Sequence, residues 1–490
     1  MPDNHDQPLD KACYRQQATE LRERLLEAQF EMRQRGDFPV LILIAGFEVA
    51  GKGESVKLLH EWLDPRHLRV DTFGEFTDEL HARPAAWSYW QRLPSKGHIG
   101  IFFLNWYTRL LRARVNEEVD EQGFEQQLDD IRRLETMLAH EGVVLLKLWF
   151  HLSRAEMKAR LEAQQHSSER SWRLTPLEWH QLDHYDTTRR HAEQMLAHTR
   201  CRHANWTVID CADPRRRNLA VGRALLDAMR CGPAKGPPLP ALSQGGALPP
   251  RPRSEAMKRK DYKRERNREQ RRLLSLMRKK RMRRHAVVAV FEGNDAAGKG
   301  GSIRRVTDAL DPREYRIVPI AAPSQEALAH PWLWRFWQQL PRLGGRMTIF
   351  DRSWYGRVLV ERVEGLCTPA DWQRAFEEIN DFEAQLAEAG IIVVKFWLAI
   401  DSDTQLARFR AREASPLKRY KITDEDWRNR GKWDDYATAV GDMVARTSTD
   451  TARWTVIDAN DKRHARVAVL KTLNDAIERA FAKDRQGDGQ

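Results

Sequence analysis

A glycine-rich stretch with the pattern Gly-x-x-x-x-Gly-Lys occurs twice in this chain, each time directly after an apolar run. The two stretches are GFEVAGKGES at Gly46–Ser55 and GNDAAGKGGS at Gly293–Ser302. A buried strand that runs into a glycine-rich turn and a helix start is the layout of a phosphate-binding loop. Backbone N–H groups, the helix N-terminus and the lysine then direct positive charge at one anion. The repeated pattern therefore predicts a protein that handles phosphate groups.

The two loops belong to a repeat that extends over most of the chain. Gly298 follows Gly51 by 247 positions, and the WTVID segment at Trp454–Asp458 follows the same letters at Trp206–Asp210 by 248. The step from 247 to 248 indicates one inserted residue, which we expect in the loop before the apolar run Met347–Phe350. We interpret the chain as a duplicated domain of roughly 220 residues, a period too long for a solenoid.

A Pro- and Gly-rich segment lies between the two copies and shows no apolar periodicity, which is typical of a linker. We predict an N-terminal P-loop-like domain at 1–231, a linker at 232–254 and a C-terminal P-loop domain at 255–490.

Apolar runs alternate with longer helical patterns within each copy. In the second copy the expected strands are Ala286–Phe291, Tyr315–Ile320, Met347–Phe350, Ile391–Ile400 and Trp454–Ile457. Asp371–Ala389 and Thr404–Ala411 carry apolar residues at the three- and four-residue intervals of a helix. This alternation predicts an α/β fold, with a parallel sheet covered by helices on both faces. Ligands are then expected beyond the carboxyl ends of the strands.

The chain of 490 residues is strongly basic, with a net charge of +12. Such a charge indicates an anionic partner, and composition alone does not choose between nucleic acid, an inorganic polyanion and a nucleotide. No run approaches the length of about 18 apolar residues that a membrane span needs. The first residues lack a basic-then-apolar signal pattern, so a cytoplasmic location is the default expectation. The five cysteines show no zinc-binding spacing and are expected to be reduced.

The segment Met257–His285 is dense in Arg and Lys and poor in acids. Its pattern predicts an amphipathic helix with Leu273, Leu274 and Met277 on one face. The basic residues form either a solvated helix face or a docking surface for a long polyanion or a partner subunit.

The copies differ where the third strand of each is expected to end. The second copy reads IFDRSWYGR and the first reads IFFLNWYTR, so Asp351 aligns with Phe103 and Arg352 aligns with Leu104. An acid just after a buried strand, near a phosphate loop, is where P-loop enzymes hold Mg²⁺. An adjacent arginine can neutralise a phosphoryl group in transfer. We therefore predict that the C-terminal copy catalyses and that the N-terminal copy does not.

The loop lysine of the second copy, Lys299, is followed by Gly300 instead of the Ser or Thr whose hydroxyl usually ligates Mg²⁺. A metal ion would then depend on carboxylates, and the candidates are Asp295 and Asp351. The alternatives are a turn-stabilising role for Asp295 and a helix cap for Asp351. The first copy has Glu48 where the second has Asp295.

The segment Arg408–Tyr436 is crowded with Arg and Lys. It is either a solvated helical face or a lid that closes over phosphates, excludes water and brings guanidinium groups to the reacting centre. The first copy keeps a diluted version at Ser167–Asp186.

The segments GNDAAGKGGS, FDRSWYGRVLVERV, VVKFWLAI and KRYKITDEDWRNRGKWDDY together resemble the family-two polyphosphate kinases, over about Arg281–Ile477 and more weakly over Pro39–Arg230. Two fused copies, with the Asp-Arg pair missing from the first, are similar to the class-two members, which make ADP from AMP with inorganic polyphosphate as the donor. The resemblance implies a fold like that of thymidylate kinase, with a P-loop core and a helical lid.

The resemblance also implies roles for individual residues. The implied catalytic set is Asp295, Lys299, Asp351 and Arg352, with Mg²⁺, or Mn²⁺ in its place, on Asp295 and Asp351. The implied phosphate-binding loop is Gly293, Asn294, Ala297, Gly298, Gly300, Gly301 and Ser302. The implied lid and polyphosphate-binding set is Arg357, Glu361, Arg362, Lys418, Lys421, Arg428 and Arg430.

The implied function is transfer of the terminal phosphoryl group of polyphosphate to a nucleoside monophosphate, AMP to ADP, in either direction. The expected partners are polyphosphate and AMP or ADP, without a specific nucleic acid or a membrane, and homo-oligomerisation is left open. The first alternative is an ATP-dependent nucleoside-monophosphate kinase, although its loop would normally end in Gly-Lys-Ser or Gly-Lys-Thr. A nucleic-acid-binding protein with degenerate P-loops would explain the charge, but not the pair Asp351 and Arg352.

Overall fold

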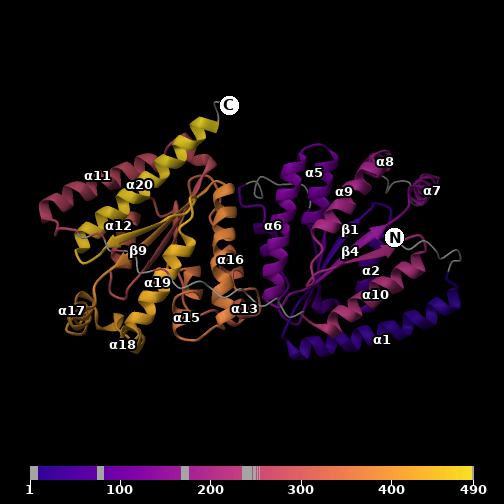
Figure 1. Cartoon of the computed structure of the whole chain (residues 1–490), viewed down its shortest axis with the longest axis horizontal. Helices are drawn as coiled ribbons and strands as arrows, with labels where there is room; N and C mark the ends of the chain where they lie inside the picture. Colours follow the sequence, from indigo (N-terminus) through magenta and orange to yellow (C-terminus); the bar gives the residue numbers. More distant parts are fainter. Residues whose placement is uncertain are drawn as a thin grey trace. The chain divides into compact units, whose positions relative to one another are not determined.

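The computed structural model describes residues 9–73, 82–166, 176–233, 246, 250, 252 and 254–487 (Figure 1). The chain divides into two compact units. Unit 1 comprises Met1–Glu75, Arg92–Pro237 and Pro323–Trp332, and unit 2 comprises Phe76–Gln91, Pro238–Ala322 and Leu333–Gln490. The long connection between the units falls within the predicted linker 232–254, most of which lies outside the described residues.

Each unit contains a five-stranded sheet whose strands are all parallel. The first sheet has the order β2-β3-β1-β4-β5, from β1 (Val40–Gly46), β2 (Leu68–Thr72), β3 (Ile99–Phe103), β4 (Val144–His151) and β5 (Trp206–Asp210). The second has the order β10-β9-β6-β8-β7, from β6 (Ala286–Gly293), β7 (Tyr315–Pro319), β8 (Met347–Asp351), β9 (Ile391–Ala399) and β10 (Trp454–Asp458). Read from the other edge, the second order is that of the first. The predicted α/β fold and the strand positions are confirmed.

The helices alternate with these strands along the chain. The helices of the first copy are α1 (Lys11–Arg35), α2 (Lys52–Trp62), α4 (Trp87–Trp90), α5 (Trp106–Val115), α6 (Glu121–His140), α7 (Arg154–Gln165), α8 (Pro176–Asp183), α9 (Tyr185–His198) and α10 (Pro214–Cys231). Those of the second copy are α11 (Arg259–Met277), α12 (Lys299–Thr307), α13 (Gln325–Leu328), α14 (Trp334–Trp337), α15 (Val360–Val363), α16 (Pro369–Glu388), α17 (Ser402–Glu413), α18 (Asp424–Gly431), α19 (Trp433–Thr447) and α20 (Lys462–Gly487). The 3-10 helices are η1 (Pro65–His67), η3 (Lys280–Arg284), η4 (Trp354–Arg357) and η5 (Arg419–Lys421).

The sheet of unit 2 is buried on both faces. One face packs on α11, α12 and α20, and its core contains Val287, Ala289 and Phe291 of β6. Helices α11 and α20 lie side by side over this face (Figure 1). The other face is covered by α16. Burial on both faces explains why β6 reads as a continuous apolar run rather than an alternating one.

The basic helix predicted within Met257–His285 is α11, although its apolar face differs slightly from the prediction. Leu273 and Met277 are buried, whereas Leu274 is only half-buried and Leu276 is buried in its place.

The inserted residue of the second copy lies where the sequence predicts it. Trp334–Trp337 follows Trp87–Trp90 by 247 positions, whereas Met347, the first residue of β8, follows Ile99 by 248. The extra residue therefore lies in the connection between α14 and β8. No helix within the described ranges is both long and apolar enough to cross a lipid bilayer.

Candidate active site

The glycine-lysine loop of unit 2 connects the end of β6 to the start of α12. Gly293 has φ +150°, and a Cβ there would lie 2.4 Å from the backbone oxygen of Leu398, so only glycine fits. Gly298 caps α12 with φ +107°, a left-handed conformation that glycine adopts without strain. Lys299 Nζ donates to the backbone oxygen of Gly293 at 2.7 Å, which folds the lysine back over the loop. The first N–H groups of α12 have no partner within the helix and can bind an anion.

The remaining loop residues are positioned by their neighbours. Asn294 Oδ1 accepts from the backbone N–H of Ile400 at 3.1 Å, which ties the loop to the segment after β9. Ala297 N–H donates to Asn294 O at 3.0 Å and closes the turn. Gly300, Gly301 and Ser302 form the first turns of α12. The predicted phosphate-binding loop is thus one continuous turn and helix start.

Arg352 has a left-handed backbone, with φ 63°, directly after β8. Such a conformation is uncommon for a residue with a side chain, and strain of this kind concentrates at functional sites. Its N–H donates to Phe291 O at 3.1 Å, so β6 holds the strained turn in place. Its side chain lies between the loop and a lid helix: Nη2 is 3.6 Å from Asp295 Oδ1 and Nη1 is 3.3 Å from Glu425 Oε1. Burial lowers the pKa of Arg352, whereas the carboxylates of Asp295 and Glu425 raise it. The net effect is a raised pKa.

Two further residues of the predicted lid segment lie at the loop, and the sequence interpretation did not single them out. Asn429 Nδ2, on α18, donates to Asp295 Oδ2 at 2.9 Å. Tyr436 Oη, on α19, donates to Asn429 Oδ1 at 3.1 Å. A hydrogen-bonded chain therefore connects α19, α18 and the loop. Asn429 is the first of the letters NRG in the segment KRYKITDEDWRNRGKWDDY. Its residue type alone does not distinguish it from the neighbouring residues of the predicted lid.

A buried carboxylate was also missed. Glu292, the next-to-last residue of β6, is buried, and Ser353 Oγ donates to its Oε1 at 2.8 Å. Burial raises the pKa of Glu292, and the Lys299 ammonium opposes that rise. An acid at the end of an otherwise apolar strand was the available sequence signal, since the aligned position of the first copy is Ala45.

A cavity of about 80 Å³ opens at this end of the sheet. It is lined by Glu292, Gly293, Asn294, Asp295, Lys299, Arg352, Gly356, Gln405, Glu425, Asn429, Tyr436 and apolar side chains. Asp351 is half-buried at the end of β8, where it pairs in register with Phe291 of β6. The structure thus brings loop, strand ends and lid together, with three of the four predicted catalytic residues lining the cavity.

Several of the predicted lid residues form ion pairs or hydrogen bonds with other residues of unit 2. Arg357 and Glu361 form an ion pair at 3.2 Å, and Arg362 pairs with Asp442 at 2.8 Å. Arg428 Nε lies 3.4 Å from Glu364 Oε2. Arg430 Nη1 donates to Ser402 O at 2.7 Å, which joins α18 to α17. Lys418 and Lys421 are exposed in and before η5. None of these seven lines the cavity within the described part of the chain.

Cations also gather next to the loop residues Ala296 and Ala297. Arg408 Nη1 donates to Ala296 O at 2.9 Å, and Nη2 to Ala459 O at 2.8 Å. Arg466 lies against α12, because a Cβ on Gly301 would be 3.1 Å from its Nη2. Burial lowers the pKa of Lys462 to about 8, and the charges of Arg408, Lys418, Arg466 and Arg412 add to that effect. We call Arg408, Arg412, Lys418, Lys462 and Arg466 the cation cluster.

Unit 1 has a cavity at the corresponding position with different chemistry. Glu48 pairs with the loop lysine Lys52 at 3.1 Å and with Arg112 at 3.8 Å. Gln181, the counterpart of Asn429, accepts from the N–H of Glu48 at 2.7 Å. Leu104 shares the left-handed backbone of Arg352, with φ 55°. The scaffold is therefore kept, while the loop lysine already has an internal carboxylate.

The charged groups of unit 2 are replaced in unit 1. Ala45, Phe103 and Leu104 stand at the positions of Glu292, Asp351 and Arg352. The diluted lid predicted at Ser167–Asp186 lies partly outside the described residues, which resume at Pro176.

A divalent metal ion has suitable donors in unit 2. Asp295 follows β6, Asp351 is the last residue of the adjacent strand β8, and both are half-buried. Across the residues with described placement, no group of three or more His, Cys, Asp or Glu has the geometry of a metal site. Mg²⁺ commonly takes one or two carboxylates, with substrate phosphates and water as its other ligands. Asp295 and Asp351 are two carboxylates of the kind that such an ion takes.

The parallel sheets, with a glycine-lysine loop at the start of a helix in each unit, define an α/β protein. The sequence model of the family described as Polyphosphate kinase 2 (PPK2) matches residues 8–235 and 256–485. The chain belongs to the polyphosphate kinase 2 family and carries two copies of its domain.

Similar proteins match along nearly the whole chain. A polyphosphate:AMP phosphotransferase of Pseudomonas aeruginosa is 54% identical over 97% of this chain and 98% of its own length. Its namesake in Acinetobacter johnsonii is 41% identical over 95% of this chain and 96% of its own length. A crystal structure described as a polyphosphate kinase 2 from Pseudomonas aeruginosa superposes with a TM-score of 0.87 at 52% identity, covering 97% of this chain and 98% of that one.

Proposed function

We propose that this chain transfers the terminal phosphoryl group of inorganic polyphosphate to AMP, which makes ADP, and that the transfer is reversible. Relatives named polyphosphate:AMP phosphotransferase match it at 41% to 54% identity over nearly its full length. The structural observation that carries the proposal is the position of Arg352, between loop residue Asp295 and lid residue Glu425, at the mouth of a phosphate-type loop.

The chemistry asks for positioning and charge more than for a nucleophile. Phosphoryl transfer passes through a loose transition state that fixed positive charge stabilises. In the proposed mechanism Lys299 and the N-terminus of α12 hold the phosphate that is transferred, and Arg352 neutralises charge that develops on it. Closure of α18 and α19 through Asn429 excludes water, which would otherwise hydrolyse the phosphoanhydride.

We further propose that Asp295 and Asp351 hold Mg²⁺ or Mn²⁺. When bound, such an ion neutralises phosphate oxygens and orients them. Asn429 donates to Asp295 Oδ2 at 2.9 Å, whereas the Arg352 contact on Oδ1 spans 3.6 Å, which is long for a charge-assisted hydrogen bond, so Oδ1 can take a further ligand.

The cation cluster is the proposed entry of the polyphosphate chain. A polymer with about one negative charge per phosphate needs a run of cations, and repulsion among these five groups is relieved when an anion binds. The cluster touches the loop through Arg408 and Arg466, so a chain bound there leads to the site of transfer.

Unit 1 is proposed to be catalytically inactive. Glu48 holds the ammonium of Lys52 at 3.1 Å, so an incoming phosphate must displace an internal carboxylate. The acid and the arginine of unit 2 are absent at Phe103 and Leu104.

The proposal is tested by a direct comparison of phosphoryl donors. The full-length protein is incubated with AMP, Mg²⁺ and either long-chain polyphosphate or ATP, and ADP is quantified by ion-exchange chromatography. Turnover with polyphosphate, and much less with ATP, is the expected result. Turnover with ATP alone identifies a nucleoside-monophosphate kinase and refutes the proposal.

A further inference from the structure

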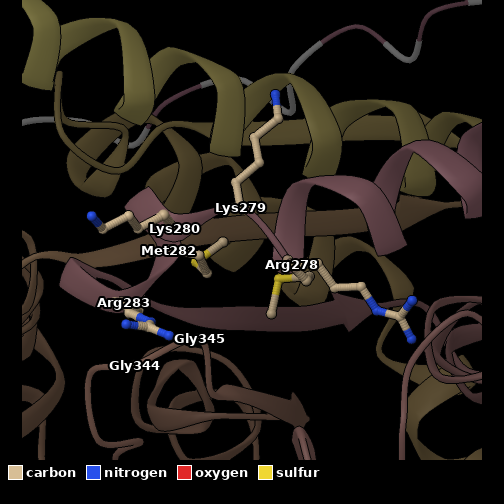
Figure 2. Close-up of a pocket in the computed structure, with 8 residues that line it drawn as sticks. Arg278, Lys279, Lys280, Met282, Arg283, Gly344 and Gly345 are labelled. Carbon is tan, nitrogen blue, oxygen red and sulfur yellow. The ribbon is translucent and has the colours of Figure 1, made fainter.

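A second cationic cavity lies in unit 2, at the far end of β6 from the glycine-lysine loop. Its volume is about 470 Å³. It is lined by the chain between α11 and η3 and by the turn before β8: Met277, Arg278, Lys279, Lys280, Met282, Arg283, Gly344 and Gly345 (Figure 2). We call it the basic cavity. Both segments precede parallel strands, so the basic cavity lies at the amino ends, whereas the active site lies at the carboxyl ends.

We propose that the basic cavity is a second docking site for inorganic polyphosphate, which retains a long chain while its end reacts elsewhere on the unit. The inference rests on the proposed function for the identity of the polymer. It assigns that polymer a contact remote from the loop, the lid and the cation cluster.

The charge of the basic cavity is one-sided. Arg278, Lys279, Lys280 and Arg283 are all exposed, and no acidic side chain lines the cavity. In the described part of the chain, none of the four forms an ion pair within 4 Å. Figure 2 shows these side chains spreading from one short stretch, with Arg283 on the side of Gly345 and Lys279 on the opposite side. Cations spread in this way suit an extended polyanion better than one compact phosphate.

Nearby carboxylates do not cancel this charge, because they have closer partners. Asp311 interacts electrostatically with Arg278, but it forms its ion pair with Arg313 at 2.8 Å. Glu478 interacts electrostatically with Lys279, but it forms its ion pair with Arg272 at 2.7 Å.

The shape of the basic cavity is set by the backbone. Gly344 and Gly345 have φ 103° and 82°, and both N–H groups donate to His285 O, at 3.0 and 2.9 Å. Met282 is buried beneath the cavity, and a Cβ on Gly345 would lie 3.3 Å from its Cγ. Hydrogen bonds and packing on Met282 therefore hold the backbone around these cations in place.

The charge is not a requirement of the duplicated fold. Arg278–Arg284 contains six cations and no acid. The segment 247 positions earlier, Glu31–Asp37, contains two arginines and two acids, and its Arg35 lies 3.9 Å from Asp37. The aligned stretch of the first copy, which includes the end of α1, therefore carries balanced charge.

The distance between the two sites predicts that binding depends on the length of the polyphosphate. The 8 residues of β6 span roughly 26 Å at about 3.3 Å per residue. A long polyphosphate can occupy both sites at once, and the second contact is then intramolecular, which raises the apparent affinity. A short polyphosphate reaches only the active site.

The test compares the full-length protein with its Arg278→Gln/Lys280→Gln/Arg283→Gln variant. The matched control, Arg24→Gln/Arg33→Gln/Arg35→Gln, removes three exposed cations from α1. KM and kcat are measured for AMP phosphorylation with long-chain polyphosphate and with the shortest polyphosphate that the unaltered protein uses. We expect KM for the long chain to rise about tenfold or more, from lost multivalency. The values of kcat and of KM for the short donor should not change, which also reports an intact fold.

Equal changes with both donors, or no change with either, overturn the second site. The failure of the proposed function looks different: the unaltered protein then makes no ADP from any polyphosphate. Binding is measured separately by calorimetry, with long-chain polyphosphate and with single-stranded DNA of equal charge. The proposal expects the triple substitution to weaken polyphosphate binding selectively. If the unaltered protein binds DNA and polyphosphate with equal affinity, and the triple substitution weakens both equally, the cavity is a general binding surface for nucleic acid. That outcome refutes the proposal.

Discussion

Lys395 Nζ lies 2.6 Å from Glu383 Oε2, and both side chains are fully buried. The Lys395 ammonium also donates to Tyr355 Oη at 2.8 Å and to Thr447 O at 2.6 Å. Unit 1 repeats the pair as Lys147 and Glu135, at 2.8 Å with both side chains buried. Charges so deeply buried persist only when each is paired and hydrogen-bonded. The pair therefore joins α16 to β9, and its counterpart joins α6 to β4.

We predict that Lys395→Met destabilises unit 2 by about 3–5 kcal/mol, because the carboxylate of Glu383 stays buried without a counter-charge, although Trp354 and Tyr355 still donate to it. Urea unfolding followed by tryptophan fluorescence measures the effect. The double variant Lys395→Met/Glu383→Leu, which removes both charges, should recover much of the loss. A single variant as stable as the unaltered protein would contradict this account.

We predict that Asp351→Asn lowers kcat for ADP formation by about two to three orders of magnitude, as expected when one charge-stabilising group is lost. The melting temperature should stay close to that of the unaltered protein, since Asp351 is half-buried. The control in unit 1 is Glu48→Gln, which should leave kcat nearly unchanged. If Glu48→Gln lost activity and Asp351→Asn did not, the reaction would take place in unit 1.

Asn429→Ala should raise KM for polyphosphate and lower kcat, each severalfold, because the 2.9 Å bond from the lid to Asp295 is lost. Steady-state kinetics with both substrates checks this expectation. The matched control is Gln181→Ala, at the equivalent position of unit 1. If both variants behave alike, the bond does not couple the lid to the chemistry.

Polyphosphate binding should weaken as the pH rises through about 8, where Lys462 of the free protein loses its charge. Burial holds the pKa of Lys462 in the folded protein below that of a lysine in the unfolded chain, so protonated Lys462 destabilises the fold at lower pH. The free energy of unfolding should therefore rise between about pH 8 and the unfolded-state pKa. Lys462→Arg keeps its charge, so KM for polyphosphate should depend less on pH between 7 and 9, as a pH series of steady-state kinetics would show. An unchanged pH profile would exclude Lys462 as the titrating group.

Local patterns predicted the elements of the fold well. The apolar runs became the strands, and the expected helix Asp371–Ala389 is α16, Pro369–Glu388. The change of offset located the inserted residue between α14 and β8. These features depend on neighbours along the chain, through burial and periodicity, so the sequence carries them directly.

Contacts between distant segments were harder to predict. Lys462 and Arg466 joined the cation cluster from the start of α20, far along the chain from the lid motif. The sequence also did not show that Arg357 pairs with Glu361, or that Arg362 pairs with Asp442. The type of a charged residue does not identify its ion-pair partner, because ion pairs can form between residues that are distant in the sequence.

The amino-acid sequence by itself determined the duplication, the alternation of strands and helices, and the loss of the Asp-Arg pair from the first copy. Each is a property of residue type and spacing. Only the tertiary structure decided that Arg352 stands between Asp295 and Glu425, and that Glu292 is buried beside Ser353. The physical reason is that parallel strands bring their carboxyl ends together from segments widely separated in sequence, and the charges that meet there depend on that packing.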